Sequence, residues 1–286
     1  MDELMERVHV RPVLKWAGGK GRLLPELLRR LPTRFARYHE PFVGGGALFF
    51  KLASHQRITQ ATFSDINPAL IEVYIALRDC VDAVIDILKR HYYDEAYYYA
   101  MRALDPAKLS LAERAARIIF LNKTCYNGLY RENRSGQFNV PFGRYKNPTI
   151  CDEPNLRAAS GLLQGVDLEQ RHFATVLDTA QPGDFVYFDP PYHPLSSTSN
   201  FTAYSKYGFS EQDQVQLRDT FAELTRRGVR AMLSNSSAPL IYDLYQPYAI
   251  HTVYAARAIN SKAAARGKIA EVIVCNYDAD GAFLSV

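Results

Sequence analysis

The tetrapeptide Asp189-Pro190-Pro191-Tyr192 combines residue types that suit chemistry on an amine. It follows a short apolar run at residues 184–188 that predicts a strand, and ligands of open α/β sheets bind beyond the carboxyl ends of strands. Prolines are rigid and lack an N–H, so they present carbonyl oxygens in a fixed direction beside one carboxylate and one flat ring. Asp189 and the Pro190 carbonyl would accept the two N–H groups of a planar amine, and Tyr192 would stack on its ring.

Such an arrangement addresses a specific chemical difficulty. An exocyclic amino group on a base is a poor nucleophile because its lone pair is delocalised into the ring. Two fixed acceptors would favour a more tetrahedral nitrogen and direct its lone pair at an electrophile. The site would thus assist the reaction through positioning and preorganised electrostatics. A sulfonium methyl donor would supply that electrophile without a metal. The residues therefore predict catalytic roles for Asp189, Pro190 and Tyr192; the alternative is a proline-rich turn after a strand.

A glycine-rich turn points to a nucleoside ligand. Gly44-Gly45-Gly46 lies between an extended run at residues 38–42 and an apolar helix start at 47–52, and glycine allows close approach of the backbone to a ligand. Asp65 ends the next strand, 21 residues after Gly44, where a carboxylate commonly binds a ribose diol. Phe49 replaces the third glycine of the dinucleotide fingerprint. A nucleoside without a pyrophosphate fits this pattern, and a purely structural turn is the alternative.

A second glycine-containing segment lies near the start of the chain. Lys15-Trp16-Ala17-Gly18-Gly19-Lys20 again exposes backbone, and Lys20 could meet a carboxylate. Trp16 is the only tryptophan of the chain. Core filling is the alternative role for this ring.

Composition and spacing exclude several classes of protein. The four cysteines and seven histidines are scattered without a metal-ligand spacing, so we expect no metal and no disulfides, as in a cytoplasmic protein. No apolar run approaches the roughly 20 residues of a membrane helix, and the first residues lack a signal-peptide pattern.

Alternating strand and helix signals predict a mostly parallel α/β sheet covered on both faces. Helical patterns run over residues 68–88 and 211–227, and further extended runs over 61–64, 230–234, 248–254 and 269–277.

The middle of the chain breaks this alternation. Residues 90–122 look helical, and 123–146 look like a turn-rich hairpin dense in Gly, Asn, Arg and aromatics. We therefore expect an insert over residues 72–165 in a domain made of 1–71 and 166–286.

Taken together, these motifs resemble the DNA adenine methyltransferases of the Dam type. The resemblance runs through LKWAGGK at 14–20, PFVGGGALF at 41–49, SDIN at 64–67, NPALIEVY at 67–74, YNGLYR at 126–131, FNVPFGRYKNP at 138–148, DPPYHPLSSTSNFTAY at 189–204 and LSN at 233–235. It implies an α/β fold with a Rossmann-like S-adenosylmethionine-dependent methyltransferase sheet and a helical plus hairpin DNA-recognition insert. It also implies methyl transfer from S-adenosylmethionine to the amino group of an adenine in double-stranded DNA.

The resemblance assigns roles residue by residue. The residues expected to bind S-adenosylmethionine are Trp16, Lys20, Asp65, Asp189, Phe42, Gly44 and, by a loose alignment, Phe173. The residues expected to contact DNA are Lys15, Tyr126, Asn127, Leu129 and Arg131. Arg131 would read a guanine, Tyr126 and Asn127 would approach the stack around a flipped base, and the target would be GATC.

The charge distribution agrees with a nucleic-acid partner. The chain carries a net charge of only +4, but the windows 7–37, 123–146 and 251–268 carry +8, +4 and +4, which leaves −12 on the remainder. Such segregation is the footprint of phosphate contacts. We expect a monomer that acts on double-stranded DNA in the cytoplasm, at the nucleoid, and has no membrane partner. A phosphate-binding role for the loop at 257–268 stays open.

Three other classes of function are less consistent with these residues. Protein glutamine methylases have Asn at the first position of the tetrapeptide, where this chain has Asp189. A DNA-binding module without catalysis would not need intact cofactor and amine motifs. A nicotinamide oxidoreductase would need the complete glycine fingerprint.

Overall fold

The computed structural model describes residues 10–16, 18–133, 135–195, 208–256 and 268–284. These residues belong to two compact units, each built from several stretches of the chain. The first unit contains Met1–Gly19, Gly44–Thr59 and Asp65–Gln170. The second unit contains Lys20–Val43, Gln60–Ser64 and Arg171–Val286.

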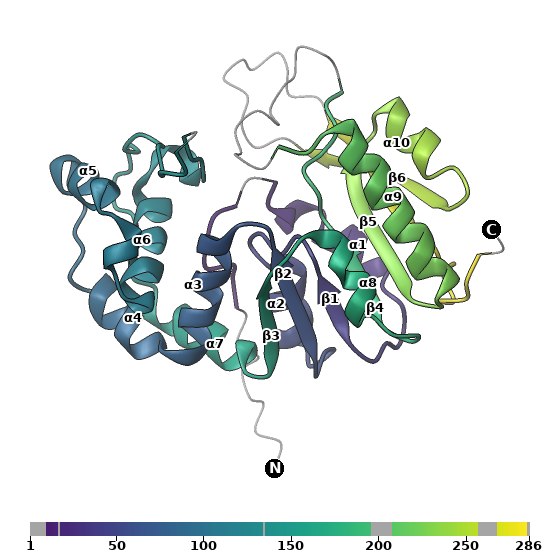
Figure 1. Cartoon of the computed structure of the whole chain (residues 1–286), viewed down its shortest axis with the longest axis horizontal. Helices are drawn as coiled ribbons and strands as arrows, with labels where there is room; N and C mark the ends of the chain where they lie inside the picture. Colours follow the sequence, from purple (N-terminus) through teal and green to yellow (C-terminus); the bar gives the residue numbers. More distant parts are fainter. Residues whose placement is uncertain (1–9, 17, 134, 196–207, 257–267, 285–286) are drawn as a thin grey trace. The chain divides into compact units, whose positions relative to one another are not determined.

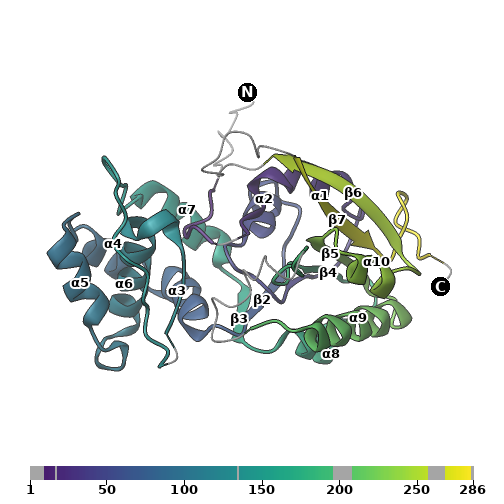
Figure 2. The same cartoon turned by 90° about the horizontal axis from the view of Figure 1, so that it is seen from above.

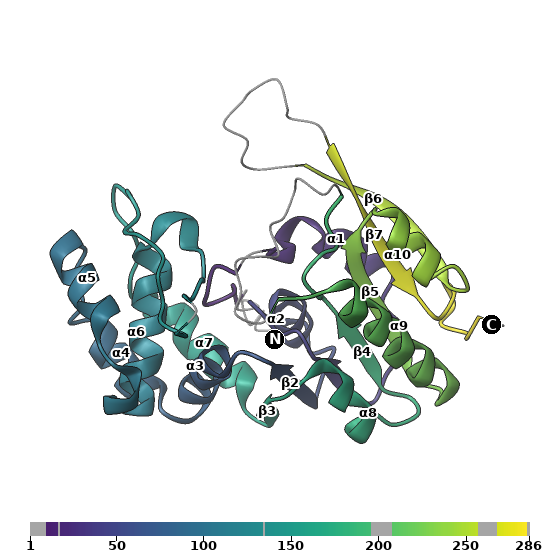
Figure 3. The same cartoon turned by 45° about the horizontal axis from the view of Figure 1, so that its top comes forward.

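The second unit is built on a mixed sheet with the strand order β2-β1-β4-β5-β7-β6 (Figure 1). Strands β1, β2, β4 and β5 are parallel, whereas β7 is antiparallel to both of its neighbours. The bounds are β1 Tyr38–Glu40, β2 Ala61–Asp65, β4 Phe185–Phe188, β5 Arg230–Ser236, β6 Ala249–Ala256 and β7 Lys268–Cys275. The expected mostly parallel α/β sheet is confirmed. The long antiparallel pair β6–β7 lies at one edge of the sheet, where β6 is the last strand (Figure 3).

The faces of this sheet follow the two-residue alternation of β-strands. Helix α9 (Glu211–Arg226) begins with a capping box between Ser210 and Asp213 and lies beside α8 (Val176–Thr179) (Figure 2). The buried core on this face contains Val186, Phe188, Ala231 and Leu233 from the strands and Leu217, Phe221 and Leu224 from α9. Phe185, which precedes Val186 and points to the other face by this alternation, packs against Phe35 and Tyr277. The remaining short helices are η1 Lys20–Arg22, α1 Leu24–Arg29, η4 Phe173–Thr175 and α10 Pro239–Leu244.

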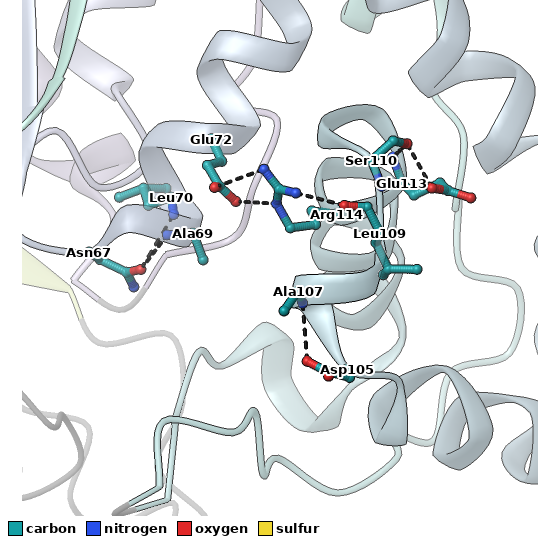
Figure 4. A network of polar contacts seen from close by, with 10 residues as sticks. All are labelled: Asn67, Ala69, Leu70, Glu72, Asp105, Ala107, Leu109, Ser110, Glu113 and Arg114. Carbon is teal, nitrogen blue, oxygen red and sulfur yellow. Dashed lines mark hydrogen bonds and ion pairs between the residues drawn. The ribbon is translucent and has the colours of Figure 1, made fainter.

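The first unit is mainly helical and is organised around α6 (Leu111–Thr124), which contacts α3, α4 and α5 (Figure 1). The Glu72 carboxylate of α3 receives two hydrogen bonds from the Arg114 guanidinium of α6, at 2.8 and 3.0 Å (Figure 4). The other bounds are α2 Ala47–Ser54, α3 Pro68–Asp79, α4 Val81–Leu88, α5 Glu95–Ala103, η2 Pro106–Lys108, η3 Tyr126–Gly128, α7 Glu153–Leu163 and β3 Val166–Gln170.

The continuous helix expected over residues 68–88 is wrong. Cys80 has φ −148° and ψ 43°, which ends α3 and starts α4 on a new axis. Without Gly or Pro at this point, the sequence gives no warning of the break. The helical stretch expected over 90–122 is also divided, because Asp94 and Ser110 cap the separate helices α5 and α6.

The described residues of 123–146 form the turn-rich segment that the sequence predicts, after the last two residues of α6. Isolated bridges join Cys125 to Phe142 and Glu132 to Phe138. In the described residues, no helix has the length and apolar character needed to cross a membrane, and no group of three or more His, Cys, Asp or Glu side chains could hold a metal ion.

Candidate active site

Asp189 follows strand β4 directly, and its carboxylate has two polar partners in the second unit. The Lys20 ammonium lies 2.7 Å from Asp189 Oδ1, and the Ser234 hydroxyl of β5 donates to the same oxygen at 2.9 Å. Lys20 thus meets a carboxylate, as the sequence suggested. Among the described residues both polar contacts of Asp189 are made by Oδ1, so Oδ2 is available as an acceptor.

The electrostatics of Asp189 reflect two opposing influences. Burial raises the pKa of Asp189 above its ordinary value, whereas the Lys20 charge and the hydrogen bonds from Lys20 and Ser234 lower it. The net direction is upward. Tyr187, which is buried, lies 2.9 Å from Ser234 through its hydroxyl; because the single Ser234 proton points to Asp189, Tyr187 is the donor in this pair.

Tyr192 is fixed at both its hydroxyl and its ring. Its hydroxyl donates to Glu271 Oε2 of β7 at 3.0 Å, and the Lys20 ammonium lies 4.5 Å from the ring centroid, within cation–π range. Burial and the neighbouring Asp189 and Glu271 carboxylates raise the pKa of Tyr192. The hydroxyl therefore stays protonated and acts as a donor. Pro190, which follows Asp189 in the chain, is buried.

An aromatic cluster of the second unit contains two of the expected cofactor residues. The rings of Phe42 and Phe173 are stacked, with centroids 5.3 Å apart. Phe188 and Phe209 meet Phe42 edge-on, at 6.4 and 5.7 Å. Although the sequence alignment of Phe173 was loose, the structure brings this residue next to Phe42.

In the first unit, Gly44 has no room for a side chain. Its φ is +46°, and a Cβ there would lie 2.8 Å from Cδ1 of Trp16. The Gly44 N–H donates to Asp65 Oδ2 at 3.4 Å, and its carbonyl accepts the Tyr74 hydroxyl at 2.7 Å. Trp16, Gly44 and Asp65, which the sequence links only by motif, are thus brought together.

Asp65 has the clearest shift in pKa among these residues. Burial raises its pKa from 3.8 to about 6, although the backbone N–H groups of Asn67 and Gly44 lower it. A carboxylate in this state lacks donors to compensate for its loss of hydration. Hydroxyl or ammonium donors from a ligand would supply them.

The hairpin expected to read DNA displays its side chains at the surface. Tyr126 is 53% exposed and Leu129 39% exposed, and Asn127, which is also exposed, has a φ of +56°. The Arg131 guanidinium is oriented by Asn139, to which it donates from Nε at 2.7 Å and from a terminal nitrogen at 3.2 Å.

The buried Asn122 of α6 joins this hairpin to Lys15. The Asn122 side-chain oxygen accepts the Lys15 N–H at 2.8 Å, and its nitrogen donates to the carbonyls of Lys15 and Gly128, at 2.8 and 3.1 Å. The Lys15 ammonium lies 4.8 Å from the centroid of the Tyr145 ring. The next residue, Trp16, stacks on Tyr130 of the hairpin at 5.1 Å.

Sequence reasoning missed the residues that hold these groups in place. They are Ser234, Glu271, Asn122, Asn139 and Tyr74. Glu271 gave a signal as a charged residue inside an otherwise apolar strand, whereas Ser234, Asn139 and Tyr74 lie in motifs of the resemblance without an assigned role. Residues 196–204 of the Asp189 motif and 257–267 of the basic loop lie outside the described residues.

Comparison with known proteins identifies a family. The model for D12 class N6 adenine-specific DNA methyltransferases matches residues 16–259. The type II methyltransferase M1.LlaDCHI of Lactococcus lactis subsp. cremoris is 44% identical over 95% of this chain and 97% of its own. The type II methyltransferase M.MjaIII of Methanocaldococcus jannaschii is 41% identical over 94% of this chain and 100% of its own. The DNA adenine methylase of Escherichia coli (strain K12) is 34% identical over 92% of this chain and 94% of its own.

The family match covers most of the chain, and these relatives match along nearly their whole length. The family implies S-adenosylmethionine as the methyl donor and DNA as the substrate. The chain belongs to the D12 class of N6 adenine-specific DNA methyltransferases.

Proposed function

We propose that this enzyme methylates the adenine of GATC in double-stranded DNA, after rotating the base out of the helix. The observation that carries the chemical part is the state of Asp189: Lys20 and Ser234 hold Oδ1, and Oδ2 is available to a substrate N–H. The Pro190 carbonyl follows in the chain as the second acceptor. Two acceptors of this kind match the two hydrogens of an adenine amino group.

The residues would assist the transfer by orienting the amino nitrogen. With both N–H groups held, the nitrogen lone pair is directed toward the incoming methyl carbon, a contribution of positioning and electrostatics. When bound, S-adenosylmethionine supplies a methyl group on a sulfonium, which is reactive without a metal. The C–N bond would form as the methyl–sulfur bond of the sulfonium breaks and the neutral thioether S-adenosylhomocysteine leaves. The nitrogen would then lose one proton, and Asp189 Oδ2 would accept it. The raised pKa of Asp189 makes it a better acceptor than an ordinary aspartate.

The residues present fit S-adenosylmethionine. In the first unit, Asp65 is a partly buried carboxylate short of donors, and the absence of a Cβ at Gly44 lets the Trp16 ring pack against this turn. In the second unit, Phe42 and Phe173 offer flat apolar surfaces, and Asp189 carries a negative charge. We propose Trp16, Lys20, Asp65, Asp189, Phe42, Gly44 and Phe173 as the cofactor-binding residues.

Reading of the DNA sequence is proposed for the hairpin and Lys15. The exposure of Tyr126, Asn127 and Leu129 leaves them available to a duplex, and Arg131 is oriented by Asn139. A bidentate Arg–guanine contact discriminates against a wrong base by roughly 1–3 kcal/mol. Base flipping costs on the order of a few kcal/mol, which side chains that fill the vacated stack would offset.

The test uses purified protein, labelled S-adenosylmethionine and a set of duplexes that differ by one base in GATC. We expect transfer to GATC and a loss of about 5- to 150-fold at a replaced guanine, the factor that 1–3 kcal/mol corresponds to. With Arg131→Ala, the duplex in which one particular guanine is replaced should be methylated as fast as the GATC duplex. Equal transfer to all duplexes by the wild type would refute the sequence assignment.

We also propose that one chain acts alone, at the nucleoid in the cytoplasm. Light scattering of the protein with one duplex should give a complex containing a single chain of 32.4 kDa. A complex with two chains would contradict the monomer.

A further inference from the structure

The loop that carries Asp189 and Pro190 is not held by its own backbone. Pro190 and Pro191 have no N–H to donate, and between described residues no backbone–backbone hydrogen bond involves residues 189–195. A catalytic loop in this condition needs another source of rigidity, because a displacement of about 1 Å can lower a rate by two orders of magnitude.

Three buried side chains supply this rigidity. Asn235 of β5 is fully buried and accepts the His193 N–H at 3.0 Å. Gln214 of α9, 1% exposed, donates to the Pro191 carbonyl at 3.1 Å. Ser236 donates to the His193 carbonyl at 2.6 Å.

These side chains also fix one another. The Asn235 side-chain nitrogen donates to Gln214 Oε1 at 3.1 Å, and the same Asn235 oxygen that binds His193 accepts the Ser236 N–H at 2.8 Å. Both amides therefore have their oxygen and nitrogen assigned by their partners, which leaves neither free to flip. The geometry connects α9, β5 and the loop in one buried network.

We infer that Gln214, Asn235 and Ser236 are positioning residues for methyl transfer. They bind the loop on the C-terminal side of Pro190 and so determine where the Pro190 carbonyl points. Gln214 occupies the Pro191 carbonyl, whereas among the described residues no donor meets the carbonyl of Pro190. The network thus selects which of the two proline carbonyls is available to the amine. This inference rests on the proposed role of Pro190.

The central variant is Gln214→Met, which keeps the approximate volume and removes both hydrogen bonds. The matched control is Gln216→Met on the same helix, at an exposed position. We measure single-turnover methyl transfer to a GATC duplex, together with the dissociation constants for S-adenosylmethionine and the duplex, on protein whose folding is checked by circular dichroism.

For Gln214→Met we expect the single-turnover rate to fall by about 10- to 100-fold, with both dissociation constants within about twofold of the wild type. The control should keep the wild-type rate. A residue with a purely structural role would lower the melting temperature without changing the rate of the folded protein, and that result would overturn the inference. If Gln214→Met does not fold, Ser236→Ala decides the question: a severalfold loss of rate supports the inference and an unchanged rate overturns it.

The same experiment separates this inference from the proposed function. A wild type that transfers no methyl group to any duplex contradicts the proposed function. A wild type that transfers normally beside an equally fast Gln214→Met contradicts only the positioning role.

Discussion

Asp65→Asn is expected to stabilise the ligand-free protein at pH 8 while weakening its binding of S-adenosylmethionine. Burial raises the pKa of Asp65 to about 6, because the N–H groups of Asn67 and Gly44 do not make up for the lost hydration of the charge. Asparagine has the same shape without the charge. If Asp65 binds the cofactor as proposed, its charge lowers the stability of the ligand-free protein and raises the affinity for the ligand.

The expected size follows from the shift in pKa. An acid whose pKa rises on folding destabilises the folded state at every pH at which it is ionised. The loss of stability from Asp65 is therefore complete above pH 6 and disappears as the pH falls toward 3.8. The rise of the Asp65 pKa from 3.8 to about 6 corresponds to about 3 kcal/mol of lost stability when the carboxyl is ionised. The amide of asparagine still accepts the Asn67 N–H but loses the longer Gly44 contact, worth about 1 kcal/mol. The variant should therefore gain about 2 kcal/mol at pH 8.

Thermal melting of wild type and Asp65→Asn at pH 5 and pH 8 measures this effect. The advantage of the variant should shrink by about 1.4 kcal/mol between pH 8 and pH 5, because the wild-type carboxyl binds its proton. Asp243→Asn, at an exposed position of α10, is the matched control. With S-adenosylmethionine added, the melting temperature of the wild type should rise more than that of Asp65→Asn.

Two outcomes would refute this reasoning. A variant that is less stable than the wild type at pH 8 would show that the carboxylate is not short of donors. A difference in stability that does not change with pH would show that Asp65 titrates normally.

Three further substitutions test other parts of the site. Gly44→Ala places an alanine in a left-handed conformation that costs about 1–2 kcal/mol, and its Cβ pushes against Trp16. Calorimetry should show an affinity for S-adenosylmethionine at least tenfold weaker. An unchanged affinity would show that the packing of Trp16 against Gly44 does not matter for cofactor binding. Lys20→Met removes the charge that lowers the pKa of Asp189, so the acid limb of the single-turnover pH profile should move to higher pH, and a move to lower pH would contradict the ion pair. Asn122→Ala leaves three backbone groups without their partner and should destabilise the protein by about 2–3 kcal/mol in thermal melting; full stability would show that the hairpin is held otherwise.

The sequence predicted the residues whose signal is local. Asp189 is a candidate from sequence because it follows an apolar strand and precedes two prolines, and Gly44 because it lies between a strand and a helix. Short motifs of this kind carry their own backbone geometry, so a single stretch of chain suffices to place them.

The residues that orient the site were not predictable in this way. Gln214, Asn122 and Glu271 are single polar residues in helices or strands, and each acts on a loop distant in the sequence. Their partners become apparent only once the chain is folded, because a lone amide in a helix is ordinarily a solvated side chain. The break at Cys80 is similar, since its cause is not a helix-breaking residue type.

The most direct test of the account is the chemical identity of the product. A GATC duplex is incubated with the protein and isotopically labelled S-adenosylmethionine, digested to nucleosides and analysed by mass spectrometry. We predict labelled N6-methyladenine with the wild type and none with Asp189→Ala, which should still bind the duplex. Absence of N6-methyladenine from a wild type that binds the duplex, or an undiminished yield from Asp189→Ala, would contradict it.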